Sequence, residues 1–251
     1  MTKLLNNYSF TGLIVLCVLV ASACAGESGI FDNSDAEFHP IFNGSDLSGW
    51  DGDERFWSVE NGVIVGETSS ENQTEINTFL IWEEDEPADF EVQFSYRFVI
   101  VSDREYGNSG MQFRSERFEN EDFPESDYAV RGYQADKAIS DWIPGIHYEE
   151  GGRGILARRG QKILIDSNGE IQEERFAEED ELGEYITHTE WNDYHVYANG
   201  DTLRANINGQ LMHEIIDQSP EAKDQGIIAF QLHRGPPMRV EITDVEIRYL
   251  N

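Results

Sequence analysis

Apolar and polar residues alternate along much of the chain, whereas no long stretch carries apolar residues at the spacing of a helix. The clearest example is the segment from Phe90 to Ile100, in which every second residue is aromatic or aliphatic and the intervening residues up to Arg97 are polar. This pattern predicts a strand with one buried face. A second alternating segment, 226–233, places Gln231 and His233 on one face and the larger apolar residues on the other. Its polar end predicts a sheet with core on one side and a site on the other.

Turn signals separate the alternating segments. Asn-Gly pairs occur at positions 61–62, 168–169, 199–200 and 208–209, and Asn-Gly favours hairpin turns because both residues accept positive φ. In the last segment the parity of the apolar positions changes near Thr243-Asp244, which predicts a β-bulge. These signals, with strands about every ten residues, predict an all-β fold. We expect one two-sheet antiparallel β-sandwich of the jelly-roll kind over residues 38–251.

The N-terminus reads as a targeting segment. Residues 1–23 contain Lys3, an apolar run and small residues directly before Cys24, which predicts a secretory signal. The apolar run is shorter than the roughly 20 residues of a membrane span. The residues before Cys24 resemble a bacterial lipobox, so Cys24 is the expected lipidated N-terminus, with simple cleavage before it as the alternative. Residues 24–37 are an expected flexible tether. We therefore expect a protein of the periplasm or cell surface that contacts membrane only through this anchor.

Charge and cysteine content exclude further classes. The chain has 18 Lys and Arg residues against 49 Asp and Glu residues, a formal net charge of −31 at pH 7. Nucleic acid is not an expected partner, because its binding depends on cationic side chains that neutralise phosphates. The acidic runs 83–86, 119–122 and 173–184 lack the spacing of a calcium loop, so we interpret them as solvated loops. The mature chain retains one cysteine and forms no intramolecular disulfide.

Signatures of common enzyme classes, such as a phosphate-binding loop or a Gly-x-Ser-x-Gly elbow, are missing. Polar and aromatic residues are instead concentrated in several blocks, which are Phe56 to Gly66, Asn77 to Leu80, Asn108 to Ser115, Gly132 to Asp136, Tyr148 to Arg153, Glu190 to Asn192 and Gln231 to His233. In type and order these blocks resemble the 3-keto-disaccharide hydrolase family, formerly called domain of unknown function 1080. The resemblance covers about residues 38–250.

The resemblance implies a concanavalin A-like jelly roll and the cleavage of glycosides already oxidised at carbon 3. A ketone at carbon 3 acidifies the proton on carbon 2, so a base can remove it and expel the group on carbon 1, after which water adds. Such a reaction needs a general base, a cation or donor for the enolate oxygen, and an acid for the departing oxygen. The segment from Asp141 to His147 departs from the family pattern, so the family's leaving-group preference is not carried over.

Four charged residues are candidate catalytic groups: Asp136, Glu150, Arg153 and His233. Asp136 closes the block Gly-Tyr-Gln-Ala-Asp at an expected strand end, and His233 closes the alternating segment described above. Glu150 and Arg153 flank two glycines, which suggest a tight loop that presents both charges. The alternatives are a turn-capping Asp136, a structural ion pair for the loop charges, and a hydrogen-bonded core position for His233.

Seven further residues are candidate substrate-binding groups: Glu67, Asn108, Arg114, Gln134, Trp142, His147 and Gln231. Gln134 shares strand parity with Asp136, and Arg114 has the parity of Gln112. Trp142 lies in a polar loop and is the candidate for stacking on a sugar. The remaining tryptophans considered, expected in the core, are Trp57, Trp82 and Trp191. In the resembled family a loop flanked by the positions of Glu67 and Asn77 borders the pocket.

Two questions stay open at the level of sequence. Asp136, Glu150 and His233 could together bind a divalent metal ion, although no spacing requires one. Three functions also remain. The first is a secreted or lipid-anchored enzyme that cleaves 3-keto-glycosides by removing the proton next to the ketone, with an oxidised glycoside as its partner. The second is a non-catalytic carbohydrate-binding module that uses the same face, and the third is an acidic cell-surface interaction protein.

Overall fold

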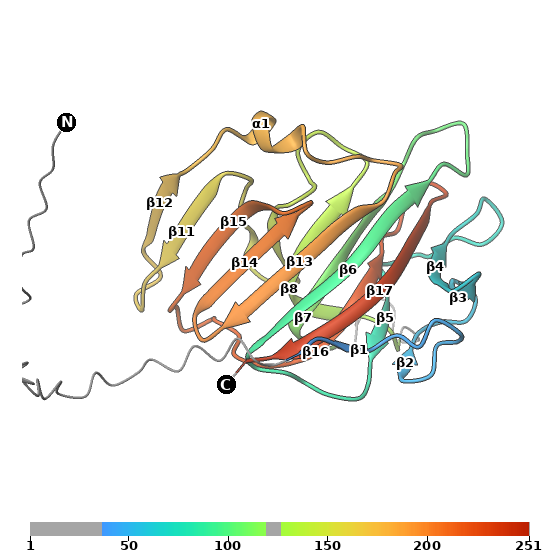
Figure 1. Cartoon of the computed structure of the whole chain (residues 1–251), viewed down its shortest axis with the longest axis horizontal. Coiled ribbons are helices and arrows are strands. Elements are labelled where there is room, and N and C mark those ends of the chain that lie inside the picture. The colour runs from blue at the N-terminus through green and yellow to red at the C-terminus, as the bar shows by residue number, and fades with distance from the viewer. Residues whose placement is uncertain (1–36, 119–126, 251) are drawn as a thin grey trace, which may run out of the picture. The chain divides into compact units, whose positions relative to one another are not determined.

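The computed structural model describes residues 37–118 and 127–250, which form two β-sheets packed face to face (Figure 1). The fold is an all-β jelly-roll sandwich, as the alternating pattern predicts. The signal segment 1–23, Cys24 and the tether up to residue 36 lie outside the described residues, so those assignments stay predictions. Within the described ranges no helix has the length and apolar character to cross a membrane.

The larger sheet has ten strands. In spatial order they are β12 (Ile171–Arg175), β11 (Gln161–Ile165), β15 (Gln210–Asp217), β14 (Thr202–Ile207), β13 (Asn192–Asn199), β6 (Phe90–Val99), β17 (Arg239–Tyr249), β4 (Val63–Glu67) and β3 (Trp57–Glu60), and β1 (His39–Pro40) pairs with β17 outside this path. Neighbours are antiparallel except β11 and β15, which run parallel. The C-terminal strand β17 therefore lies inside the sheet, between β6 and β4.

The smaller sheet has seven strands. In spatial order they are β10 (Gly154–Ala157), β9 (His147–Glu150), β8 (Val130–Ala138), β7 (Asn108–Arg117), β16 (Ile227–Leu232), β5 (Thr78–Trp82) and β2 (Trp50–Asp51). The short helix α1 (Glu179–Gly183) follows β12. In Figure 1 the smaller sheet lies behind the larger one.

The predicted turns and the predicted bulge are present. Each Asn-Gly pair connects two neighbouring antiparallel strands: β3 to β4, β11 to β12, β13 to β14 and β14 to β15. At Asn61-Gly62 and Asn208-Gly209 both residues have φ between 50° and 85°, as a type I′ turn requires. The pairing of β17 with β6 shifts between Thr243 and Glu246, and Asp244 has a φ of 52°.

The core lies between the sheets and consists of residues of one parity on each strand. Phe94 of β6 meets Phe230 of β16 edge to face, with ring centroids 5.1 Å apart. Trp57 and Trp82 are buried, as predicted. The prediction for Trp191 was wrong: this residue is 37% exposed, and the Arg97 guanidinium lies 4.7 Å from its ring centroid. Trp191 directly precedes β13, so strand parity does not bury it.

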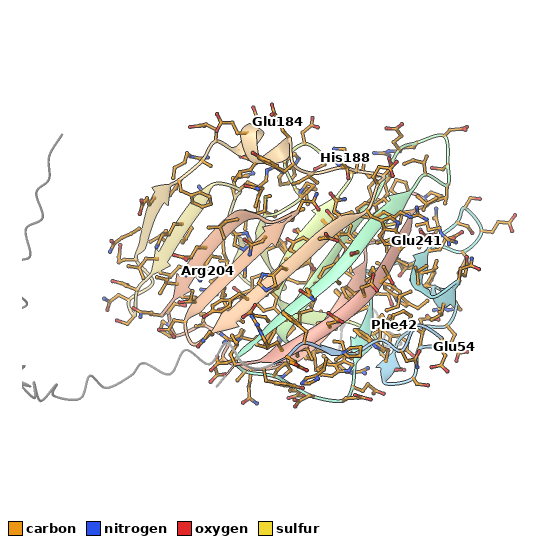
Figure 2. The ribbon with its side chains drawn as sticks, viewed as in Figure 1. Phe42, Glu54, Glu184, His188, Arg204 and Glu241 are labelled. Atoms are coloured by element: carbon orange, nitrogen blue, oxygen red, sulfur yellow. The ribbon has the colours of Figure 1, made fainter. Side chains whose placement is uncertain are left out.

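The outer face of the larger sheet carries cross-strand ion pairs. Arg204 of β14 donates to Glu214 of β15 at 2.5 Å, and Arg97 of β6 donates to Glu241 of β17 at 2.7 Å. Figure 2 labels Arg204 and Glu241 on this sheet. Pairs at least partly exposed to water contribute about 0–1 kcal/mol each. These charges suit a solvated face.

The acidic runs are partly as predicted. Residues 83–86 form an exposed loop, and residues 119–122 lie outside the described ranges. The prediction of a loop was wrong for much of 173–184, because this run completes β12 and forms α1. Strand β12 pairs only with β11, and all its residues are exposed. An edge position tolerates such a polar sequence.

Candidate active site

A pocket of about 500 Å³ lies on the outer face of the smaller sheet, the face turned away from the core. Its volume is in the range that holds small organic ligands. Six strands and the loop between β8 and β9 contribute to its lining. The polar residues that line it are Asn77, Asn108, Gln134, Asp136, Glu150, Gln231, His233 and Arg234. Seven of the eleven candidate site residues thus meet in one pocket.

Strand β8 presents Gln134 and Asp136 to the pocket because residues of their parity face outward. The alternate residues Tyr133 and Ala135 belong to the core. Gly110 of β7 lies opposite Asp136 in register, and a Cβ atom there would come within 2.5 Å of Gln134 Cγ and Cδ. The glycine therefore leaves the space that the Gln134 side chain occupies.

Side-chain amides connect the two carboxyl groups of the pocket. Gln134 Nε2 donates to Asp136 Oδ1. Gln231 Nε2 donates to Gln134 Oε1 at 2.9 Å and to Glu150 Oε2 at 3.2 Å. Asn77 Nδ2 donates to the other Glu150 oxygen at 3.2 Å, and Gln112 Nε2 donates to Gln134 Oε1 at 2.7 Å. This network orients Asp136 and Glu150 before any ligand binds.

Burial changes the protonation of both carboxyl groups. It raises the pKa of Asp136 to about 8; the Glu150 charge adds to the increase, and the hydrogen bond from Gln134 opposes it. Burial also raises the pKa of Glu150, against the hydrogen bonds from Asn77 and Gln231. At pH 7 Asp136 is therefore mainly the neutral acid and can donate a proton.

Lys137 lies behind Asp136, on the core face of β8. Its Nζ is 5.0 Å from the ring centroids of Phe94 and Phe230 and has no hydrogen-bond partner in the described part of the chain. Burial lowers the pKa of Lys137 to about 7, while the Asp136 charge acts in the opposite direction. Lys137 is a core residue and does not line the pocket.

His233 follows the end of β16 and lines the pocket. Its Nδ1 lies 2.5 Å from the Arg234 carbonyl oxygen and 3.2 Å from the Tyr106 hydroxyl. A carbonyl oxygen only accepts, so Nδ1 carries the hydrogen and Nε2 keeps a free lone pair in the neutral ring. Burial lowers the pKa of His233. The imidazole is therefore mainly neutral at pH 7, and Nε2 can accept a proton.

Arg114 does not reach the pocket, so its assignment as a substrate-binding group was wrong. The pairing of β7 with β8 shifts between Phe113 and Glu116, and Arg114 has a φ of 45°, which breaks the parity shared with Gln112. The guanidinium of Arg114 instead donates to the side chain of Asp89 and to backbone carbonyl oxygens of Ala88, Gly200 and Lys223. It holds surface loops together.

Arg153 and His147 are structural as well, which corrects both assignments. Arg153 Nη2 donates to Asp217 Oδ2 at 2.7 Å, and Asp217 ends strand β15 of the other sheet. His147 is fully buried between the sheets, where its Nδ1 lies 3.2 Å from Nε2 of His213. It has the opposite parity to Glu150, so it faces the core.

Glu67 and Asn77 flank the loop that borders the pocket in the resembled family, and here only one of these two residues lines the pocket. Glu67 lies on β4 of the larger sheet and pairs with Arg239 at 2.8 Å, so its assignment to the site was wrong. Asn77 lines the pocket and contacts Glu150. Long-range pairing decides which of the two sheets a strand joins. The sequence pattern around Glu67 carries no signal of this pairing.

We expect Arg153→Met to lower the free energy of unfolding by about 2–3 kcal/mol, because Asp217 then stays buried without its counter-charge. Urea unfolding at pH 7 measures the loss. The matched control is Arg131→Met, which removes an exposed pair with Glu116 and is expected to cost less than about 1 kcal/mol. An equal loss in both variants contradicts this role for Arg153.

The metal site considered from the sequence is not formed. Asp136, Glu150 and His233 line one pocket, but the described ranges contain no group of three or more His, Cys, Asp or Glu side chains placed to bind a metal ion. Both Glu150 oxygens already accept amide hydrogens.

Sequence reasoning missed three residues of the site. Tyr148 lines the pocket, and its shared parity with Glu150 could have identified it. Arg234 also lines the pocket, and its backbone N–H donates to Asn77 Oδ1 at 3.1 Å. Tyr106 contacts His233 from the segment before β7. No pattern in the sequence distinguishes Tyr106 from other loop tyrosines.

The family to which this sandwich with its polar pocket belongs makes it a carbohydrate-active protein. The chain belongs to the family described as the 3-keto-alpha-glucoside-1,2-lyase-like domain, whose model matches residues 37–248. This match confirms the family resemblance. No curated protein matches the sequence.

Solved structures share the fold at low sequence identity. A putative glycosyl hydrolase from Parabacteroides distasonis is 15% identical with a TM-score of 0.53, and the match covers 85% of this chain and 100% of that one. A Bacillus subtilis protein of unknown function with a galectin-like fold is 12% identical with a TM-score of 0.54, covering 85% and 94%. The carbohydrate-binding module CBM66 from Bacillus subtilis is 12% identical with a TM-score of 0.50, covering 80% and 95%. These likenesses show the fold alone.

Proposed function

We propose that this protein cleaves 3-keto-glycosides by elimination followed by hydration. The observation that supports the proposal is one pocket in which burial raises the pKa of the Asp136 carboxyl to about 8 and lowers the pKa of the His233 imidazole. When their surroundings push the pKa values of two groups apart in this way, one group is suited to act as the acid and the other as the base. At pH 7 Asp136 then holds a proton to give, and His233 can take one.

In the first step His233 Nε2 removes the proton on carbon 2, and the electron pair moves toward the ketone oxygen as an enolate. Arg234 lines the pocket and supplies positive charge that can stabilise this oxygen. The electron pair then forms the double bond between carbons 1 and 2 while the bond from carbon 1 to the leaving oxygen breaks. Asp136 protonates that oxygen, so the alcohol leaves and an unsaturated 3-keto sugar remains.

In the second step water adds to the unsaturated sugar. The Asp136 carboxylate takes a proton from water, the hydroxide adds to carbon 1, and protonated His233 returns its proton to carbon 2. Both side chains end in their starting forms, and the net reaction is hydrolysis.

Fixed amide groups support sugar binding in this pocket. The Gln231 side chain is buried, and its Oε1 has no hydrogen-bond partner within the described ranges. Unpaired buried acceptors are rare in folded proteins. A sugar hydroxyl that donates to Oε1 would satisfy this atom, and Asn108, at the edge of the pocket, offers a further amide.

The test is to incubate the mature protein with a 3-keto-glucoside and with its unoxidised parent, with and without a chelator, and to measure release of the aglycone. We expect release from the ketone alone, and in D₂O we expect deuterium at carbon 2 of the product, because the base exchanges its proton with solvent. No release from either compound, with sugar binding retained in calorimetry, contradicts the proposal and favours a non-catalytic carbohydrate-binding module.

A further inference from the structure

Apolar residues line several parts of the pocket, and one of these parts is the edge next to β9 and β10. Trp142 and Ile143 from the loop between β8 and β9, Tyr148 from β9 and Ile155 from β10 line it, and we call these four residues the apolar wall. Tyr148 and Ile155 are cross-strand partners. Arg158, directly after β10, lies 5.4 Å from the ring centroid of Trp142. The apolar wall therefore lies along the edge of the sheet formed by β9 and β10.

The apolar wall is open to solvent. Trp142 is 47% exposed and Ile155 is 39% exposed. Single exposed apolar side chains need no explanation, but several that line one pocket indicate an apolar ligand group. Ile143 and Ile155 offer neither a hydrogen bond to a sugar hydroxyl nor an aromatic face for a sugar ring. The rings of Trp142 and Tyr148 beside them can stack on an aromatic group, so the wall as a whole fits an apolar ligand group.

Three of the polar groups lie toward the opposite edge of the sheet, and Glu150 of β9 reaches two of them by hydrogen bonds. Gln231 is the second-last residue of β16, His233 follows this strand, and Asn77 precedes the neighbouring strand β5. Strand β8, which carries Asp136, lies between β9 and β7 and thus between the wall and these polar groups. Asp136 is the proposed acid for the departing oxygen. A sugar ring bound toward β16 would therefore place its leaving group toward β9 and β10.

We infer that the group released from carbon 1 is an apolar alcohol or phenol of about the size of an aromatic ring, bound on the apolar wall, rather than a second sugar. The inference rests on the proposed function for the identity of the sugar ring.

The experiment compares kcat/KM for benzyl 3-keto-glucoside, methyl 3-keto-glucoside and a 3-keto-disaccharide on the mature protein. We expect the benzyl compound to be favoured at least tenfold over the other two. A sugar hydroxyl is a better leaving group than benzyl alcohol, so leaving-group acidity cannot produce this order. In the double variant Trp142→Ala, Ile155→Asn the preference is expected to fall below threefold. Ile171→Asn, on the exposed strand β12, is the matched control and keeps the preference.

Calorimetry with unoxidised benzyl and methyl glucosides separates this inference from the proposed function. Equal efficiency on all ketones, or the disaccharide as the best substrate, overturns the inference while the proposed function stands. Cleavage of no ketone, with benzyl glucoside bound at least tenfold more tightly than methyl glucoside, refutes the proposed function and supports the wall as the binding site of an apolar group. Absence of both the kinetic and the binding preference overturns the inference.

Discussion

Asp136→Asn is expected to reduce aglycone release from a 3-keto-glucoside by at least about 100-fold, because the variant cannot protonate the departing oxygen. The same substitution is expected to stabilise the fold at alkaline pH. Asn keeps the oxygen that accepts the hydrogen bond from Gln134, and it has no charge to bury. A loss of activity together with a gain in stability is typical of a buried catalytic group.

The pH dependence of the gain in stability follows from the raised pKa of Asp136 in the folded protein. Asp136 has an ordinary pKa of 3.8 in the unfolded chain and about 8 in the folded protein. Between these values the unfolded chain binds fewer protons, so the wild-type free energy of unfolding decreases as the pH rises through this window. The variant lacks this decrease. We expect it to be more stable than wild type by at least about 2 kcal/mol at pH 9 and no more stable at pH 4.

Denaturant unfolding at both pH values and initial rates at pH 7 test the two effects together. Glu116→Gln, which changes an exposed carboxylate on β7, is the control and should alter neither quantity strongly. A variant with near wild-type activity removes Asp136 from the mechanism. A variant without the alkaline gain in stability contradicts the raised pKa.

His233→Ala is also expected to lower the rate by at least about 100-fold, because the proton on carbon 2 loses its acceptor. In the wild type the rate should fall on the acidic side as the imidazole becomes charged, and on the alkaline side near pH 8 as Asp136 loses its proton. The variant should keep the alkaline decrease and lose the acidic one. Added imidazole should restore part of its rate.

The rate of aglycone release, measured between pH 5 and 10 for the wild type and the variant, shows both the acidic and the alkaline decrease. His39→Ala changes an exposed histidine of β1 and serves as the matched control. An unchanged acidic limb in His233→Ala would mean that another group titrates there and would move the role of the base elsewhere.

Local pattern was sufficient for most of the fold. Side chains alternate across a strand, so the buried face of Phe90–Val99 and the outward position of Gln231 follow from parity alone. The Asn-Gly turns and the bulge at Asp244 also depend on the backbone preferences of a few neighbouring residues. The same rule placed Asp136 and Gln134 on one outward face.

The four wrongly assigned site residues depend on non-local structure or on parity that was not applied. The bulge turns Arg114 away from Gln112, and the partner of Arg153 is 64 residues distant on the other sheet. The sheet to which Glu67 belongs is decided by pairing with β17. His147 could have been placed correctly, because an outward Glu150 requires an inward residue three positions earlier.

The place of β17 also limits when this protein can fold. Strand β17 pairs with β1, β4 and β6, which precede it by about 140 residues or more in the sequence. Until Arg239–Tyr249 has been synthesised, β4 and β6 have no strand between them, and the larger sheet stays divided. Contacts between strands far apart in the sequence form slowly because the intervening loop must close first. Closure of the larger sheet therefore depends on pairing between strands that are distant in sequence, and we expect this pairing to limit the folding rate.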